Sequence, residues 1–349
     1  YIEGLRRKVN DSPPIKLTLP RESYRGSKRN QVFFLPGKSS NNEMPLDQAL
    51  AFMAKDNPQT IQGTKIETYL PSNNLFIPVD PARAISSGLI SAGDSSIQFV
   101  NKIPITIDKQ YITKDQLAVM DVIMSNLYDR PVYFSVTCQE SKLMNLQDYT
   151  QMEGLGLKVV PIKSTSQEEF YIYGSGRVDT DKVHDRVTQK WRWGGFDKRR
   201  LYVDNSYAAS VQAHKMVIWR SAEQMMNAGK TQQAVAVTDA FFTGFPHMNF
   251  PYDARVLPHI NIYIRAGEME KAKTHMRILA TETADWMEFF DSIDQEDLQS
   301  GFMLDYRLAT NAVNEILKVS KTMKDDAFAQ EMEALLGPYG ATTPDPGIE

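Results

Sequence analysis

The most unusual stretch of side chains that could do chemistry is Trp191-Arg192-Trp193, followed directly by Gly194 and Gly195. Aromatic rings beside an arginine can stack on a sugar ring or clamp a peptide. These residues also suit a joint between two domains, because large aromatic side chains dominate the area that interfaces bury. We therefore predict either a ligand contact or an interdomain contact for Trp191, Arg192 and Trp193, and we favour the interdomain contact.

A second stretch, Lys38-Ser39, follows a predicted strand and Gly37, as the end of a phosphate-binding loop does. That loop has the pattern Gly-x-x-x-x-Gly-Lys-Ser/Thr, and its first glycine would fall on Val32. The glycine-rich backbone that cradles phosphate is therefore missing, and the sequence predicts no nucleotide site here.

Three carboxylates, Asp179, Asp181 and Asp185, surround His184 and could in principle hold a cation, but a solvated loop that leads into a helix explains them as well. No His-Glu-x-x-His pattern and no Gly-x-Ser-x-Gly elbow occurs. Cys138 ends an apolar run, where a small buried residue is commoner than a nucleophile. The sequence thus predicts no catalytic residue, no metal and no cofactor.

The composition is that of an ordinary folded protein. The 349 residues carry a net charge of −4, which argues against nucleic acid as a partner. A single cysteine excludes an intrachain disulfide but leaves the compartment open. No apolar run approaches the roughly 18 residues of a membrane span. The chain begins at Tyr1 without a methionine, so we expect a longer natural protein.

The first half alternates short apolar runs with turns, which predicts an α/β domain over residues 1–200. The predicted strands of its first part cover residues 31–36, 65–70, 75–79 and 97–107. The runs 65–70 and 75–79 are expected to pair around the intervening turn, and the last strand to bend or break at Pro104.

A helix is predicted after Thr113, since Thr113 and Gln116 have the spacing of a capping box and an apolar stripe follows at helical period. Further along, the sequence indicates a buried strand over 131–136, a helix over 143–154 and a strand over 157–162. This alternation of strands and helices predicts a βαβ-type sheet.

The second half, residues 201–340, has the pattern of long amphipathic helices. Gly229 and Ala234 recur as Gly267 and Ala272, at the spacing of the turn glycine and small residue of a tetratricopeptide unit. The copies are 38 residues apart against a period of about 34, which an insertion within 246–253 would explain. We expect a third, degenerate helix pair over 297–320 and 325–336, and a disordered tail over 341–349.

Several short motifs occur in a characteristic order. They are Tyr111-Ile112-Thr113-Lys114-Asp115-Gln116-Leu117, Arg130-Pro131-Val132-Tyr133-Phe134, Glu153-Gly154-Leu155, Val159-Val160-Pro161, Trp193-Gly194-Gly195, Tyr202-Val203-Asp204-Asn205, Ala228-Gly229-Lys230 and Asn249-Phe250-Pro251-Tyr252-Asp253. Taken together they resemble a bacterial family of multi-pass membrane proteins, long labelled only as a domain of unknown function. The resemblance covers most of residues 1–280.

The membrane half of that family is similar to protein O-mannosyltransferases. The resemblance therefore implies a C-type glycosyltransferase, which takes its sugar from a lipid-linked donor outside the cytoplasm. It also implies catalytic carboxylates on loops between membrane helices that this chain does not contain, so no family catalytic residue is carried over. Finally, it implies the inner membrane of a bacterium, with this region facing the periplasm.

Three functions remain open. The leading hypothesis is an accessory or acceptor-recognition module of a membrane glycosyltransferase, whose partners are its own membrane-embedded half and acceptor proteins or peptides. The first alternative is a structural or assembly module that mediates protein interaction. The second is a self-sufficient α/β enzyme with its site at the carboxyl ends of the strands. A pocket with convergent polar groups would separate an enzyme from a structural module.

Overall fold

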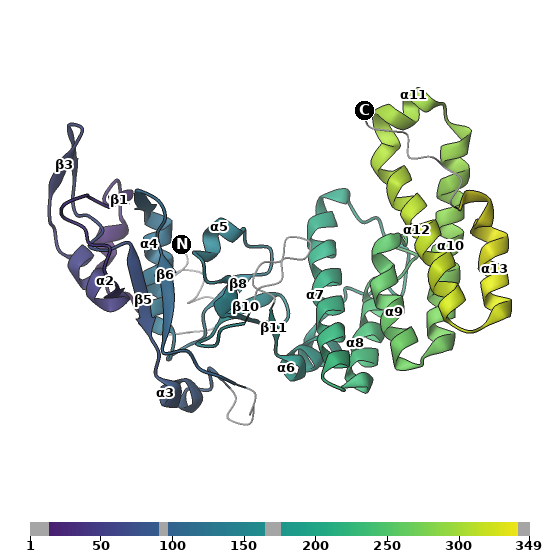
Figure 1. Ribbon diagram of the computed structural model, residues 1–349, viewed down its shortest axis with the longest axis horizontal. Helices are drawn as coiled ribbons and strands as arrows, with labels where there is room; N and C mark the ends of the chain where they lie inside the picture. The colour runs from purple at the N-terminus through teal and green to yellow at the C-terminus, as the bar shows by residue number, and fades with distance from the viewer. Residues whose placement is uncertain (1–13, 91–96, 165–175, 341–349) are drawn as a thin grey trace. The chain divides into compact units, whose positions relative to one another are not determined.

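A computed structural model of the chain describes residues 14–90, 97–164 and 176–340 (Figure 1). The chain divides into two compact units, Tyr1–Asp179 and Thr180–Glu349, called unit 1 and unit 2 below. Unit 1 holds several small sheets together with helices, and unit 2 is helical. Residues 180–200, which the sequence placed with the α/β domain, group with the helical unit. The predicted disordered tail lies outside the described residues.

The strands and longer helices of unit 1 follow one another in short steps. In chain order they are β1 (Gln31–Phe33), β2 (Met44–Pro45), α2 (Leu46–Ala54), β3 (Gln59–Ile61), β4 (Thr64–Ile66), β5 (Asn74–Pro78), α3 (Pro81–Ser86), β6 (Lys102–Thr106), β7 (Tyr111–Thr113), α4 (Lys114–Asn126), β8 (Tyr133–Ser135), α5 (Glu140–Leu143), β9 (Thr150–Met152), β10 (Gly156–Val159) and β11 (Arg177–Val178).

The described strands form small separate sheets with the orders β1-β7, β2-β5-β6, β3-β4 and β11-β9-β10-β8. Most pairs are antiparallel, and only β2 with β5 and β9 with β11 are parallel. The predicted βαβ arrangement around α4 is wrong. The strand before α4, β7, pairs with β1, whereas the strand after it, β8, pairs antiparallel with β10. Local alternation could not show this, because it does not specify which strands pair.

Three further sequence predictions are corrected by the pairing. β4 pairs with β3 and β5 pairs with β6, so the runs 65–70 and 75–79 do not form a hairpin. β6 passes through Pro104 unbroken, since it is an edge strand and proline needs no partner on its open side. β8 is an exposed edge strand and not a buried one.

The predicted helix over 143–154 is also wrong. Leu143, Leu146, Tyr149 and Met152 are all buried, which explains the helix-like spacing of three. The backbone breaks between the first two, because Met144 and Asn145 take left-handed φ angles of 54° and 62°. A 3₁₀ turn and strand β9 follow.

Helix α4 organises the core of unit 1. It begins at the predicted capping box of Thr113 and Gln116, and its apolar stripe is buried. On the same helix the buried Asp121 carboxylate accepts hydrogen bonds from the backbone N–H of Thr18 (2.7 Å) and Leu19 (3.0 Å). A buried charge needs such donors to remain in the interior. Asp121 thereby fixes the segment that precedes β1 onto the core.

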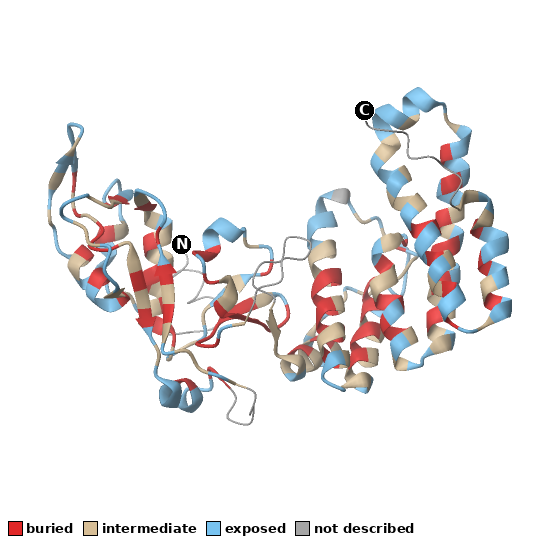
Figure 2. Ribbon diagram, in the orientation of Figure 1, coloured by how far each residue is buried: buried red, intermediate tan, exposed pale blue. Residues whose placement is uncertain are grey.

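Unit 2 is built from helices that pack against their neighbours in sequence (Figure 1). The helices are α6 (Thr180–Asp185), α7 (Ala208–Asn227), α8 (Thr231–Gly244), α9 (Leu257–Ala266), α10 (Met269–Ser292), α11 (Gln295–Asp297), α12 (Met303–Thr322) and α13 (Asp326–Leu336). Buried residues lie on the sides of α7, α8 and α9 that face adjacent helices, and exposed residues lie on the outer sides (Figure 2).

The turns of the first two helix hairpins have the same geometry. Gly229 and Gly267 take φ angles of 73° and 83°, a region that costs glycine little. In each turn the residue after the glycine donates its N–H back to a helix carbonyl, over 2.8 Å at Lys230 and 2.9 Å at Glu268. This is the double-bonded end of a helix known as the Schellman motif. The predicted helix pairs and the positions of both glycines are thus observed.

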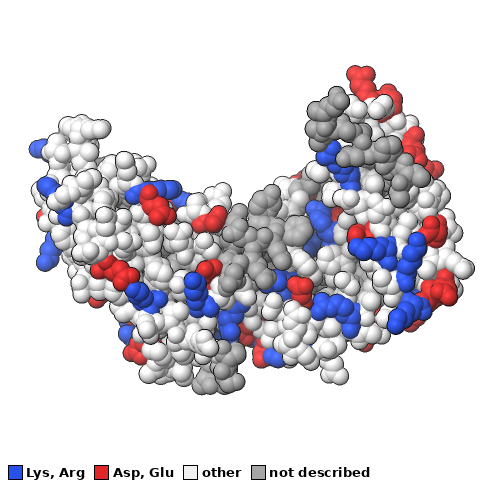
Figure 3. Space-filling view, in the orientation of Figure 1, with Lys and Arg blue, Asp and Glu red and all other residues white. Residues whose placement is uncertain are grey.

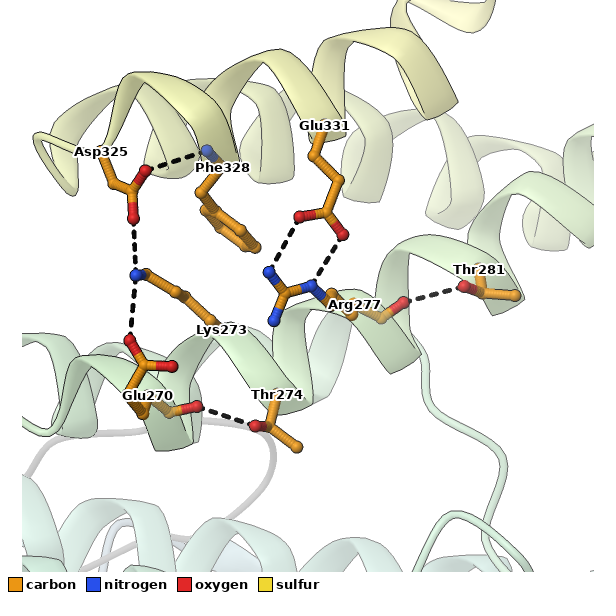
Figure 4. Close-up of polar contacts among 8 residues, drawn as sticks. All are labelled: Glu270, Lys273, Thr274, Arg277, Thr281, Asp325, Phe328 and Glu331. Atoms are coloured by element: carbon orange, nitrogen blue, oxygen red, sulfur yellow. Dashed lines mark hydrogen bonds and ion pairs between the residues drawn. The ribbon is translucent and has the colours of Figure 1, made fainter.

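Charged side chains fasten α13 to α10 (Figure 4). The guanidinium of Arg277 donates to both carboxylate oxygens of Glu331, over 2.7 and 2.8 Å, and lies 5.1 Å from the ring centroid of Phe328. One turn earlier on α10, Lys273 forms ion pairs with Asp325 and Glu270. Helix α13 is therefore held on α10 by ion pairs and by a guanidinium that lies over an aromatic ring.

Candidate functional site

The Trp191–Trp193 segment lies on unit 2. The ring of Trp191 meets those of Trp193 and His214 edge-on, with centroids 5.4 and 5.5 Å apart. The Trp193 ring lies 5.6 Å from that of Phe245, at the end of α8. Both indoles are half-buried and Arg192 is exposed. These ring contacts are all within the helical unit, and the interdomain role of the segment stays a prediction.

The residues after the tryptophans are fixed by Asn249, whose role sequence reasoning missed. Its side-chain amide donates to the carbonyls of Phe196 (2.6 Å) and Arg199 (2.9 Å), and its oxygen accepts the N–H of Leu201 (2.6 Å). The Phe196 ring also packs on Phe250, with centroids 5.0 Å apart. Two motifs of the resemblance, around Trp193 and around Asn249, are thereby joined. In the sequence, the one hint of this contact was that both motifs belong to the set that carries the family resemblance.

The three carboxylates near His184 each bond a different side chain, so they do not converge on one point. Asp181 pairs with Lys230 over 2.7 Å, and this hydrogen bond lowers the pKa of Asp181. Asp185 pairs with Lys190, and Asp179 accepts a hydrogen bond of 3.2 Å from the side chain of Gln151. Within the described ranges, no group of three His, Cys, Asp or Glu side chains lies close enough to hold a metal ion.

The remaining candidates from the sequence are Ser39, Lys38 and Cys138, and the environment of each explains it without catalysis. Ser39 donates to the carbonyl of Leu70 and accepts the N–H of Leu35, so its hydroxyl closes the turn after β1. Lys38 bonds the side chain of Gln59. Burial raises the pKa of the half-buried Cys138 thiol, which makes it a poorer nucleophile.

A buried polar network joins two other motifs of the resemblance, on the sheet that contains β8, β9 and β10. Lys158 and Glu153 form an ion pair and are each 2% exposed. The hydroxyl of Tyr133 donates to the second carboxylate oxygen of Glu153 over 2.7 Å, and the Gln151 amide donates to the first over 3.0 Å. The guanidinium of Arg177 in turn donates to Gln151 over 2.8 Å. This network links side chains of β8, β9, β10 and β11.

Unit 1 has a groove of about 760 Å³ between β1 and the β3–β4 hairpin. That hairpin stands out from the rest of the unit (Figure 1). Its turn residues, Gln62 and Gly63, both have positive φ angles, as a tight hairpin requires. A second hollow, beside α5, has about 220 Å³. The groove has the size of a binding site for a small molecule or a short peptide segment.

One wall of the groove is an unpaired strand edge. In an antiparallel pair, alternate residues direct their N–H and C=O groups toward the partner strand. The carbonyl of Asn30 accepts the N–H of Lys114, and the N–H of Phe34 donates to the carbonyl of Gln110. Asn30 and Phe34 therefore direct their backbone groups toward β7, and Gln31 and Phe33 direct theirs to the opposite side of β1.

That outer edge is paired only at its ends. The Arg29 N–H donates to the Glu67 carboxylate over 3.0 Å, and the Phe33 carbonyl accepts the Leu70 N–H over 2.8 Å. Between these two bonds, the N–H and C=O of Gln31 and the N–H of Phe33 have no partner among the described residues. The groove thus offers an alternating set of backbone donors and acceptors.

The side chains around the groove suit binding by hydrogen bonds and apolar contact. Primary amides and phenylalanine rings make up much of its lining, and Lys65 and Glu67 add one charge of each sign. The amides and rings belong to Asn30, Gln31, Gln62, Gln110, Phe33 and Phe34. Amides bond backbone groups and hydroxyls without requiring a charge on the ligand. This surface can therefore bond backbone groups of a ligand and contact its apolar side chains.

The protein thus consists of two units. The first is a domain of small sheets with an open strand edge, and the second is a domain of helical hairpins. A model of the family described as TMEM260-associated domain 2 matches residues 1–182, which covers unit 1. The chain belongs to this family. No curated protein and no solved structure matches the chain.

Across the described ranges, no helix is both long enough and apolar enough to cross a bilayer.

Proposed function

We propose that this chain is the acceptor-recognition module of a membrane glycosyltransferase-like protein, and that the groove of unit 1 binds an extended polypeptide. The supporting observation is the free edge at Gln31 and Phe33. An extended peptide can add to such an edge as a further strand, gaining affinity from main-chain hydrogen bonds and specificity from alternate side chains. The phenylalanines beside the edge supply the apolar contacts.

Two further findings support the assignment to a glycosyltransferase. The family domain coincides with the unit that contains the groove. The motifs of the chain resemble membrane proteins whose other half is similar to protein O-mannosyltransferases, and such enzymes modify hydroxyl groups of polypeptides. The proposal places this unit in the periplasm of a bacterium, with the membrane-embedded half of the same protein as its partner.

We infer that unit 2 is a tetratricopeptide-like array. The two equal turns lie 38 residues apart, as the numbers of Gly229 and Gly267 show. Five residues after each glycine, Ala234 and Ala272 are fully buried, where small side chains let neighbouring helices approach closely. In this proposal the array contributes interaction surface of its own.

Peptide binding to the full chain tests the role of the groove. The probes are labelled, unstructured peptides of about ten residues, rich in Ser, Thr and Val, with fluorescence anisotropy as the readout. Gln31→Pro removes one free N–H without breaking any bond to a described residue. Gln31→Ala is the matched control, because it removes only the side chain. We expect Gln31→Pro to weaken binding by roughly fivefold, since a hydrogen bond contributes about 1 kcal/mol, and Gln31→Ala to have a small effect.

The same pair of variants can be placed in the full-length gene. If the groove recognises acceptors, cells with Gln31→Pro should lose the glycoproteins that also disappear without the gene, whereas cells with Gln31→Ala should keep them. Normal glycoprotein profiles with Gln31→Pro, at normal protein levels, would exclude acceptor recognition by this edge. That result would favour a structural or assembly role for the chain.

A further inference from the structure

The far end of unit 2 carries an excess of negative charge. Between residues 282 and 305 the chain has no Lys or Arg, and it has the following acidic residues: Glu282, Asp285, Glu288, Asp291, Asp294, Glu296, Asp297 and Asp305. These eight carboxylates carry a charge of −8, whereas the net charge of the whole chain is −4. Figure 3 shows the part of this charge over α11 as a group of red side chains at the tip of the unit.

Few of these carboxylates are neutralised within the chain. Glu282 pairs with His247 over 3.0 Å, and Asp294 caps the short helix α11 by accepting the N–H of Asp297. The other members of the set form no ion pair with any described residue. Asp305 interacts electrostatically with Arg255, and the charge of the remaining members faces solvent.

Large apolar side chains lie among the carboxylates. Trp286 and Phe289, one turn apart on α10, are 43% and 37% exposed. The Phe289 ring packs edge-on against the half-buried Phe302, just before α12, with centroids 5.3 Å apart. We call Trp286, Phe289 and Phe302 the aromatic patch. Behind it, Phe290 packs on Tyr306 in α12, so the patch rests on a fixed base.

We propose that the aromatic patch docks a basic amphipathic helix of another protein. Exposed aromatic side chains rimmed by charges are typical of interaction sites. An amphipathic helix lays its apolar side into such a surface, and here its Lys and Arg would meet Asp285 and Glu288, which directly precede Trp286 and Phe289. The open indole also favours a cation above its face.

The same carboxylates disfavour two other partners that an apolar surface could bind, namely a second copy of this chain and an anionic lipid surface. In a symmetric dimer, the patch of one copy would meet the patch of the other, and like charges would lie opposite one another. A surface of anionic lipids would be repelled in the same way. This surface lies in unit 2 and is independent of the groove in unit 1, so either proposal can fail alone.

A binding experiment on the full chain tests the proposal. The probe is a labelled helical peptide of about 18 residues, with Leu and Lys on opposite faces, and its counterpart with Glu in place of Lys is the first control. The charge variant is Asp285→Asn/Glu288→Gln, and the aromatic variant is Trp286→Ala/Phe289→Ala. A matched control, Glu22→Gln/Asp47→Asn, removes two exposed carboxylates from unit 1.

We expect the unchanged chain to bind the basic peptide and not the acidic one. The charge variant should weaken binding at least roughly fivefold and reduce its dependence on salt, while the unit 1 control should change it less than about twofold. The aromatic variant should weaken binding further. Should the aromatic variant fail to fold, the charge variant still decides, because its changes are on exposed side chains.

Three results would overturn the proposal. The first is no binding of the basic peptide to the unchanged chain. The second is equal weakening by the patch variants and the unit 1 control, which would show attraction to overall charge only. The third is a dimer in sedimentation experiments, or pelleting with anionic vesicles, that the patch variants abolish.

Discussion

The indole of Trp193 lies directly against the backbone of Gly244, the last residue of α8. A Cβ atom added to Gly244 would stand 2.2 Å from the indole Cε3, closer than any two carbon atoms can pack. A predicted functional tryptophan and a glycine that attracted no notice in the sequence thus form one contact, 51 residues apart along the chain.

Gly244→Ala should therefore destabilise unit 2. The added methyl group must displace the indole or bend the end of α8, and overpacking of this kind costs about 1–3 kcal/mol. Chemical denaturation measures the loss. Gly301→Ala is the matched control, since no atom lies within 4 Å of its added Cβ. If Gly244→Ala costs as little in the wild-type chain as in a Trp193→Ala background, the contact is absent.

Ala234→Leu should overpack the crossing of α8 with its neighbours. Ala234 is fully buried, so the larger side chain has no solvent to enter, and we expect a loss of about 1–3 kcal/mol. The melting temperature should fall, while Ala236→Leu, on the half-buried side of the same helix, should change it less. An unchanged melting temperature for Ala234→Leu would show that the register of the helix pair is wrong.

The buried pair of Lys158 and Glu153 predicts a large, non-additive effect. Glu153→Gln removes the carboxylate that pairs with the buried Lys158 ammonium, and breaking a buried ion pair typically costs about 3–5 kcal/mol. Replacing both residues, as Glu153→Gln/Lys158→Met, should restore part of the stability. Glu140→Gln, on an exposed carboxylate of unit 1, is the control. A double variant less stable than Glu153→Gln would contradict this account of the network.

Acid should destabilise unit 2 through His259. Burial, together with nearby Lys215, lowers the pKa of His259 to about 3, against about 6.5 in an unfolded chain. Between these values the unfolded state binds a proton that the folded state does not, so stability falls as the pH falls. From pH 6.5 to 5 the loss is about 2 kcal/mol. Burial also lowers the pKa of His275, to about 4, which acts in the same direction.

His259→Phe tests this dependence. The His259 ring stacks on Phe241 with centroids 3.6 Å apart, so phenylalanine keeps the ring contact and removes the titration. Unfolding free energies measured from pH 7 to 5 should decline less steeply for this variant than for the unchanged chain. Equal slopes for wild type and His259→Phe would mean that His259 is not buried in the neutral form.

The Arg277–Glu331 pair should contribute modestly. Both side chains are nearly half exposed, so a double-mutant cycle should give a coupling of about 0.5–1 kcal/mol that salt reduces. Arg277→Ala should cost more than Glu331→Ala, because the guanidinium also covers the Phe328 ring. Equal single-variant costs would show that this ring contact contributes nothing.

Much of unit 2 could be predicted from sequence because its signals are local. A glycine that must take a positive φ, a small residue five positions later and an apolar stripe at helical period all act within one hairpin. Gly229, Ala234, Gly267 and Ala272 accordingly lie where the spacing predicted. The capping box at Thr113 is local in the same sense, and it was also found.

Unit 1 could not be predicted in this way, because strand pairing joins residues far apart. The sequence indicated apolar strands at 31–36 and 157–162, but not that β7 turns away from β8 to pair with β1. The free edge at Gln31 is bounded by the bonds of Arg29 to Glu67 and of Phe33 to Leu70, more than 35 residues later. Backbone groups are the same at every position, so only the tertiary structure decides which of them remain unpaired.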